Sequence, residues 1–263
     1  MILLLKCAQV ERLGRAEGDQ ADALRGSSTS SPTMNYMPAL ESERSEMAHR
    51  TATTELFQAG HFHDQAQIVA VFAGWRSFAT PFGTIRAEAG EILAVPSGVF
   101  HAPRNSDESS VLVLFLDKNH PVAKGIGQPS VTNGQGARRL DEILDCVATR
   151  LGGYQTPDQL QMSSTLTNLI TETESSLRDV AEKLGYSPDG FTRAFSRWVG
   201  TTPAKYRIAH RLTIARSMIR EGAMLADVAF ATGFSDQSHL GRCFLRAFGT
   251  TPAAYRSGLL ALT

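Results

Sequence analysis

The sequence predicts an α+β protein with a β-rich N-terminal half and an all-α C-terminal half. In residues 51–117, short apolar runs are separated by Gly, Pro, Asn and Asp, which is typical of strands joined by turns. The C-terminal half contains one segment twice. Leu177–Arg207 and Leu225–Arg256 share 16 identical positions once one residue is inserted in the second copy. Each copy has the layout of a helix-turn-helix unit: a short helix, a glycine turn and a capped second helix.

Composition shifts and glycine-rich stretches divide the chain into four segments. Residues 1–50 lack sustained periodicity and contain a linker-like run of Ser, Thr and Gly. We expect them to be disordered or to precede the true start of translation, and we assign them no function. The other predicted segments are a β domain at 51–120, a connection at 121–156 and a helical domain with the repeat at 157–263.

The connection contains a helix that we expect from Arg138 to Leu151. Its apolar residues recur at helical spacing, which predicts one apolar face: Leu140, Ile143, Leu144 and Val147. This face is a candidate dimer contact or a lid on the β domain. A further helix is predicted from Pro157 to about Ile170.

Charge is distributed unevenly along a chain whose formal net charge is zero. Residues 177–256 hold 12 Lys and Arg against 6 Asp and Glu, and the remainder holds 14 against 20. A basic region carrying about +6 therefore balances an acidic remainder of about −6, which indicates a nucleic-acid partner for the C-terminal half.

Cysteine usage and hydropathy set further bounds. The chain has three widely spaced cysteines, too few for a disulfide framework or a cysteine-rich zinc site. No apolar run approaches the ~20 residues of a membrane-spanning helix. We therefore expect a cytoplasmic protein with no membrane partner.

Helix caps delimit both copies of the repeat. In the first copy, Ser176 and Asp179 form a capping pair, and Ser187 caps the second helix with Pro188 at its first position. In the second copy, we expect Ser235 to be the corresponding cap. The apolar residues of each second helix recur at helical spacing and are expected to face the core; in the first copy they include Trp198.

The residues between these apolar positions face outward and are of the types that contact DNA. Arginine recognises guanine, glutamine recognises adenine, and arginines and caps also bind phosphates. A two-unit solenoid scaffold is the structural alternative, but solenoids need three or more repeats. The candidate DNA-binding residues are Asp189, Thr192, Arg193, Arg197, Gln237, Ser238, Gly241, Arg242 and Arg246.

Residues from about 160 to 260 resemble the C-terminal domain of AraC/XylS-type bacterial transcription regulators, most clearly in GFSDQSHLGRCFLRAFGTTPAAYR. The resemblance implies two recognition helices in adjacent major grooves. It places Asp189, Thr192 and Arg193 in the first and Gln237, Ser238, Gly241 and Arg242 in the second. Two glycines depart from the pattern. Gly190 is expected to weaken the first recognition helix, and Gly241 offers no side chain to a base.

The N-terminal half resembles the two cupin motifs. The first is partial, with His61 and His63 and with Gln67 where cupins usually have Glu. The second is complete, with Gly90, Pro96, Gly98, His101 and Asn105 in the sequence. This resemblance implies a small jelly-roll β-barrel. AraC-type regulators often carry such a barrel as the sensing domain, so both halves indicate the same class.

The chemistry of a candidate pocket follows from residue type and spacing. His61 and His63 alternate along a strand and share one face, Gln67 can join them, and a turn can bring His101 back opposite. Three imidazoles and an amide oxygen can hold a divalent metal such as Zn, Ni, Fe or Mn. A metal-free pocket for an organic effector and a purely structural or dimer role remain as alternatives.

Together these features favour a one-component transcription regulator that responds to a small-molecule or metal effector. Promoter DNA, a homodimer partner and, for an activator, RNA polymerase are the expected macromolecular partners. The alternative is a metal-dependent cupin enzyme with a helical appendage, but the duplicated helix-turn-helix favours the regulator and a non-enzymatic function.

Overall fold

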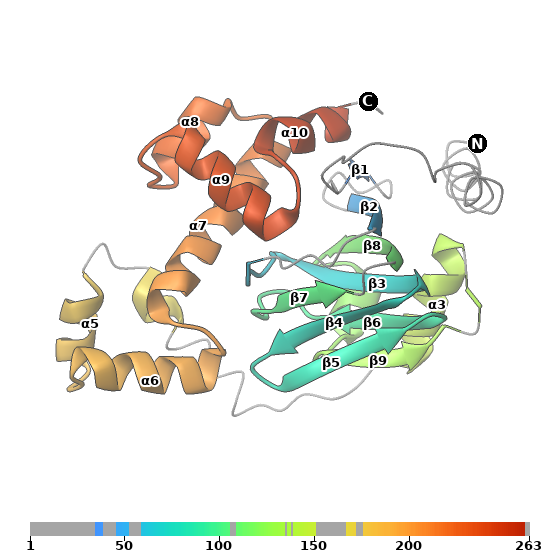
Figure 1. Ribbon diagram of the computed structural model, residues 1–263, viewed down its shortest axis with the longest axis horizontal. Helices are drawn as coiled ribbons and strands as arrows, with labels where there is room; N and C mark the ends of the chain where they lie inside the picture. Colours follow the sequence, from blue (N-terminus) through green and yellow to red (C-terminus); the bar gives the residue numbers. More distant parts are fainter. Residues whose placement is uncertain are drawn as a thin grey trace.

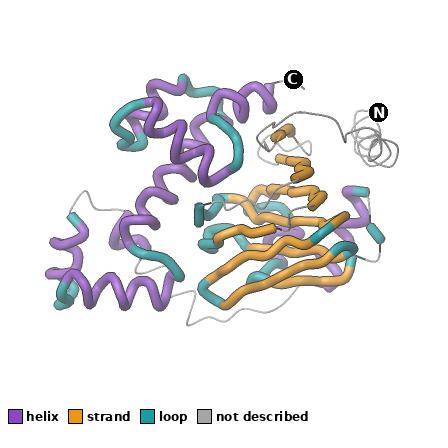
Figure 2. Tube along the Cα trace, in the orientation of Figure 1, coloured by secondary structure: helices purple, strands orange, loops and turns teal. Residues whose placement is uncertain are grey.

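The computed structural model describes residues 35–38, 46–52, 59–105, 109–134, 136–137, 139–150, 167–171 and 176–260. A β part and an all-helical part lie side by side (Figures 1 and 2), which confirms the predicted α+β class. No helix in the described ranges is both long and apolar enough to cross a membrane.

The β part consists of two antiparallel sheets (Figure 1). The larger sheet has the order β1-β2-β8-β3-β6-β9, and the smaller has the order β5-β4-β7. The strands are β1 Asn35–Pro38, β2 Glu46–Ala52, β3 Gln65–Ala73, β4 Trp75–Thr80, β5 Gly83–Glu88, β6 Glu91–Val95, β7 Ala102–Asn105, β8 Ser109–Asp117 and β9 Ser130–Asn133.

The larger sheet is buried on both faces, because its strands supply apolar side chains in both alternating directions. Val69, Val113 and Phe115 pack with Phe78 of the smaller sheet. Residues of the opposite parity on β3 and β8 pack on the outer face against α2 Pro121–Gly125 and α3 Leu140–Arg150. This arrangement explains why β8 is a continuous apolar run rather than an alternating one.

Two predictions for the N-terminal half need correction. The sheets extend beyond residues 51–120 on both sides, because β1 and most of β2 lie within residues 1–50 and β9 lies at 130–133. Residues 1–34 are outside the described ranges. The apolar face of α3 covers the larger sheet, which is the lid alternative for this helix: Ile143 and Val147 are fully buried there, so this face is not free for the alternative role of a dimer contact.

The helical part contains both predicted helix-turn-helix units, joined by one long helix, α7 Pro203–Arg220 (Figure 1). The first unit comprises α5 Leu177–Lys183 and α6 Pro188–Val199. The second comprises α8 Leu225–Ala231 and α9 Gln237–Phe248, followed by α10 Pro252–Leu260. Of the helix expected from Pro157 to about Ile170, only residues 167–171 are described, and they are helical.

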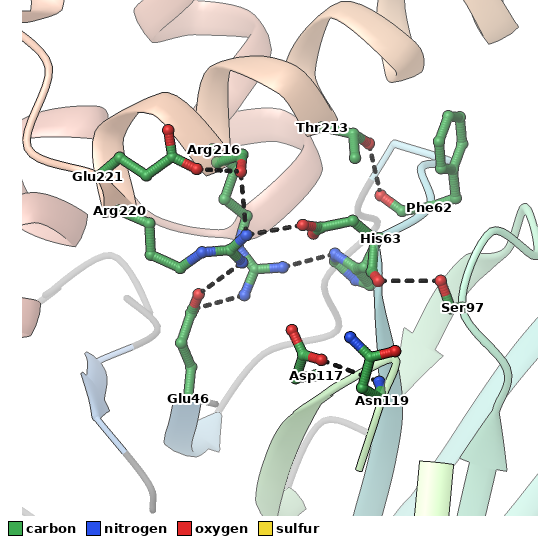
Figure 3. Close-up of polar contacts among 12 residues, drawn as sticks. Glu46, Phe62, His63, Ser97, Asp117, Asn119, Thr213, Arg216, Arg220 and Glu221 are labelled. Carbon is green, nitrogen blue, oxygen red and sulfur yellow. Dashed lines mark hydrogen bonds and ion pairs between the residues drawn. The ribbon is translucent and has the colours of Figure 1, made fainter. Parts of the chain in front are cut away.

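Both helix-turn-helix units pack directly against the β part. Phe62 and Phe100 belong to the apolar core of the first unit. The core of the second unit is continuous with the interior between the sheets. The α7 hydroxyl of Thr213 donates a hydrogen bond to the Phe62 carbonyl, 2.9 Å away (Figure 3). The two halves therefore form one packed body in this structure.

Candidate functional site: two recognition helices and a buried histidine cluster

Capping residues define where each recognition helix begins. In the first unit, Ser176 and Asp179 form a full capping box, and Ser187 accepts a hydrogen bond from the Gly190 amide. In the second unit, Asp236, and not the predicted Ser235, is the N-cap and accepts from the His239 amide at 2.7 Å. The inserted residue of the second copy moves the helix start by one position. Ser235 instead donates to the Asp236 carboxylate.

The nine predicted DNA-binding residues lie on the recognition helices α6 and α9 and retain solvent exposure. Seven of them are exposed, and Thr192 and Gly241 are half-buried. Both outward faces are thus available to a partner. Arg246 differs from the others because it also lines a cavity between the two halves.

Two expectations about the first recognition helix change. Gly190 lies in the first turn, not the helix interior, and a Cβ there would come within 3.0 Å of the Ser187 hydroxyl. Glycine therefore allows the cap to approach closely at this position. Trp198 is 36% exposed, whereas the neighbouring Val199 is buried. The apolar face of α6 therefore ends on Val199, and Trp198 is not a core residue.

The three predicted histidines come together in the β part, where it meets the helical part. His61 and His101 form an antiparallel bridge with backbone hydrogen bonds of 3.0 and 2.8 Å. The turn before His101 is fixed by the Gly98 amide, which donates to the His63 carbonyl. One candidate ligand atom from each imidazole lies within 4.8 Å of the others, and all three side chains are buried.

Backbone carbonyls orient two of the imidazoles. The Nδ1 of His61 lies 2.7 Å from the Ala59 carbonyl, and that of His101 lies 2.9 Å from the Val99 carbonyl. A carbonyl only accepts, so the proton in each neutral ring is on Nδ1 and the lone pair is on Nε2. The Nε2 of His101 is buried without a hydrogen-bond partner among the described residues.

The third imidazole is held differently. The Nδ1 of His63 lies 2.7 Å from Nη1 of Arg216 on α7 (Figure 3). A guanidinium only donates, so this Nδ1 carries the lone pair and the proton is on Nε2. The Nε2 of His63 is buried with no partner in the described part of the chain. His63 therefore has the opposite tautomer to His61 and His101.

Gln67 is the fourth predicted residue of the pocket, and no hydrogen bond among the described residues joins it to the histidine cluster. It is buried on β3, and its Oε1 has no hydrogen-bond partner among the described residues. It shares strand parity with Val69, which faces the space between the sheets. Gln67 is thus turned to the same interior as the histidines, but no described contact joins it to them.

Burial keeps the three histidines neutral. Desolvation is the main cause that lowers the pKa of all three, and it brings the pKa of His101 from 6.5 to about 4. The positive charge of Arg216 further lowers the pKa of His63. Neutral rings are the form in which histidine binds a metal, so burial favours the ligating form.

The histidines fit a divalent transition metal in residue type, burial and, for two of them, tautomer. At metal–nitrogen distances of about 2.0–2.1 Å, nitrogens of a tetrahedral site lie about 3.3 Å apart. The present separations, up to 4.8 Å, require the rings to move closer. His63 must also give up its bond to Arg216.

A buried polar network that the sequence did not predict surrounds Arg216. Its Nη2 pairs with Glu46 on β2 at 2.6 Å, and its Nε donates to the Tyr255 hydroxyl, which in turn donates to Glu46 at 2.7 Å. Arg220 bridges Glu46 at 3.1 Å and Asp64 at 2.7 Å. Arg216 and Glu46 are each 1% exposed. The network joins α7 and α10 to the β part.

No pattern in the sequence indicated this network. Arg216 and Arg220 are spaced four apart on a helix in a basic region, so they resemble phosphate-binding residues on a solvated face. Glu46 lies in the segment to which we assigned no function. Burial, and not spacing, distinguishes these residues from the exposed arginines of α6 and α9.

The fold and these sites define a two-part protein: a double helix-turn-helix domain packed on a β-sandwich with an enclosed histidine cluster. Comparisons with known proteins agree with this class. Residues 180–258 match the family model described as "Helix-turn-helix domain". The C-terminal region is accordingly a helix-turn-helix domain, and it resembles the AraC/XylS type.

Two named relatives match over about a third of this chain. The transcriptional activator RhrA of Rhizobium meliloti is 34% identical over 84 residues, covering 31% of this chain and 26% of that protein. The activator RhaS of Escherichia coli is 35% identical over 80 residues, covering 30% of this chain and 29% of that protein. The chain thus matches less than a third of the length of these curated relatives, both of which are named as transcriptional activators.

A solved structure resembles the whole arrangement. Unsaturated fatty acid-bound ToxT from Vibrio cholerae has a TM-score of 0.52 at 14% identity, and the match covers 90% of this chain and 99% of ToxT. At this identity the likeness concerns the fold, and it extends over both halves.

Proposed function

We propose that the chain is a sequence-specific DNA-binding transcription regulator, with its β half sensing a small-molecule or metal effector. One observation carries the DNA-binding part: two capped helix-turn-helix units, joined by a single helix, present outward residues on both second helices. Two recognition helices joined by one continuous helix suit successive major grooves. As a regulator of promoters it would act in the cytoplasm. A second copy of the chain and, for an activator, RNA polymerase are its candidate protein partners.

A gel-shift and sequence-selection experiment on the full chain tests this proposal. We expect duplex DNA binding that weakens as salt rises, because phosphate contacts release counterions. The double variant Arg193→Ala/Arg242→Ala should lose sequence preference. Arg86→Ala is the matched control, because Arg86 is an exposed arginine of the β part paired with Glu88. Equal loss in both variants, or no salt-dependent binding to any promoter DNA, would count against the proposal.

Two effector classes have support in the structure. The first is a divalent transition metal held by His61, His63 and His101, with Gln67 as a candidate fourth ligand. When bound, the metal would supply a fixed positive charge and a rigid link among the three histidines. Elemental analysis and thermal shift with Zn, Ni, Fe or Mn test it, with His63→Ala as the variant that should abolish uptake.

The second class is an organic anion with an apolar body. A cavity of about 430 Å³ between the two halves is lined by apolar side chains including Phe100, Ile208 and Leu212, and by Lys205 and Arg246. ToxT, the structural neighbour, has been solved with an unsaturated fatty acid bound. Thermal shift with an unsaturated long-chain fatty acid should be reduced in Lys205→Met and unchanged in Lys183→Met, an exposed lysine of α5. Equal shifts in both variants would remove this cavity from consideration.

A further inference from the structure

Arg216 connects the candidate metal site to the DNA-binding half through a single hydrogen bond to His63. We propose that a metal at the histidine cluster and the docking of α7 compete for His63, so that metal binding expels Arg216 and loosens the second helix-turn-helix unit from the β part. This inference rests on the metal being the effector in the proposed function. It adds how metal binding would be coupled to DNA binding.

The competition follows from the lone pairs of a neutral imidazole, which has only one. If the metal takes Nδ1 of His63, it uses the lone pair that Arg216 Nη1 now contacts at 2.7 Å. If the metal takes Nε2, the proton must move to Nδ1, and two N–H donors then face each other across the same 2.7 Å. Either way the hydrogen bond between Arg216 and His63 is lost.

Charge acts in the same direction. The guanidinium of Arg216 is permanently positive and sits in direct contact with one ring of the cluster. A divalent cation bound among the three rings would be repelled by this charge, and burial leaves little water to screen the repulsion. Metal binding and the present position of Arg216 are therefore unfavourable together.

If Arg216 leaves the network, its partner Glu46 is not left unpaired. Glu46 also accepts from Arg220, at 3.1 Å, and from the Tyr255 hydroxyl, at 2.7 Å. The carboxylate therefore keeps a cation and a donor when Arg216 moves. Arg220 is itself paired with Asp64 at 2.7 Å. Two cations around one carboxylate allow the network to exchange partners.

The second unit also covers the cluster directly. The Phe248 ring, at the end of α9, lies 5.2 Å from the His61 ring and 5.6 Å from the His63 ring, measured between centroids. Arg216 lies over the Phe115 ring at 4.2 Å and near Phe248 at 5.4 Å. Contraction of the three histidines around a metal would therefore disturb contacts of both α7 and α9, the two helices that position the second recognition surface.

Cobalt titration of the full chain tests the competition, with Co²⁺ absorption as the binding readout. The variant Glu46→Gln/Arg216→Met removes both buried charges together, which avoids an unpaired buried carboxylate. We expect it to bind Co²⁺ about ten-fold more tightly than the wild type, the equivalent of about 1.4 kcal/mol. Arg211→Met is the matched control, because Arg211 lies on the same helix and donates to the Gly233 carbonyl of the second unit.

Hydrogen–deuterium exchange supplies the second readout. Cobalt should raise exchange in α7 and β2 of the wild type and leave exchange in the double variant unchanged. Arg216→Lys, which keeps the charge near Glu46 but shortens the reach to His63, also should bind Co²⁺ more tightly than wild type and carries the test if the double variant does not fold. Equal cobalt affinity in wild type and the Arg216 variants overturns the proposal.

The cobalt measurements distinguish a failure of the competition for His63 from a failure of metal binding itself. If neither the wild type nor the variants take up cobalt, both the proposed competition and the proposed metal effector are wrong. Gel shifts on the same preparations still test DNA binding. If cobalt binds with equal affinity throughout, only the competition falls. Cobalt binding in wild type without added exchange in α7 would also overturn it, because the helix would not have been released.

Discussion

The two helix-turn-helix units have the same fold but contact the β part through different chemistry. Tyr206 and Tyr255 occupy equivalent positions, each three residues after the proline that follows the repeated Gly-Thr-Thr. Tyr206 stacks on Phe62, with ring centroids 4.9 Å apart and planes 20° apart. Tyr255 places its hydroxyl in the buried network and donates to Glu46. One tyrosine makes an apolar contact, and its duplicate makes a polar one.

Apolar and polar contacts between the helical half and the β half have different physical consequences. Apolar burial stabilises in proportion to area and does not depend on the charge or ligand state of a partner. Buried ion pairs contribute little net stability, because desolvation offsets attraction, but they discriminate strongly between correct and incorrect pairings. The contact of the first unit is therefore expected to be insensitive to the histidine cluster. The second unit adds to its own apolar packing a polar contact that can respond to what occupies the cluster.

Removing the apolar anchor should give the largest effect. Phe62→Ala should lower the free energy of unfolding by about 3–5 kcal/mol, because the ring is buried and packs on Tyr206. Urea denaturation of the full chain measures it. Tyr255→Phe is the matched change in the second unit. It removes a hydroxyl whose acceptor Glu46 retains both arginines, so the cost should be only about 1–3 kcal/mol. Equal costs would contradict the comparison.

The two recognition surfaces should differ less than the two anchors. Arg193 and Arg242 lie near the start of their helices and are both exposed. Each Ala variant should lose about 1–3 kcal/mol of discrimination at one base position, read out by sequence selection. Arg207 is the control, because its Nε donates to the Ile170 carbonyl. A wild-type preference in Arg242→Ala would show that the second helix does not read a base through this residue.

Lowering the pH should reduce the folding stability of the protein, and the histidine cluster should be the cause. The folded-state pKa values lie below 6.5, so the unfolded chain binds more protons once the pH falls below 6.5. Stability is fully present above that pH and is lost as the pH falls, by about 1.4 kcal/mol per pH unit for each histidine that stays neutral. Melting temperatures at pH 7.5 and 5.5 measure the loss. His101→Gln should flatten the dependence, and an unchanged slope would show that this histidine is not the source.

Sequence reasoning located most of the helical half and part of the β half. Repetition, caps and 3.6-residue spacing are local signals, so α5 to α9 and their outward residues followed directly. His61, His63 and His101 were also identifiable by residue type and by the glycine turn, although His61 and His63 lie before β3 and not on a strand as expected. The network around Glu46 was not, because it joins residues about 170 positions apart. A pattern along the chain does not show which arginine is taken into the interface.

The smallest expected effect concerns Trp198, where spacing alone suggested a core residue. Its counterpart in the second unit is Ala247, which is fully buried, whereas Trp198 is 36% exposed. Trp198→Ala should therefore cost only about 1 kcal/mol, as is typical of point changes outside the core. The reciprocal Ala247→Trp should cost more, because a closely packed position cannot accept an indole without strain. Melting temperatures of the two variants test the asymmetry. A loss near the 3–5 kcal/mol of a core tryptophan would mean that Trp198 is buried in solution. Lost DNA binding with an unchanged melting temperature would instead place the exposed ring at the DNA surface.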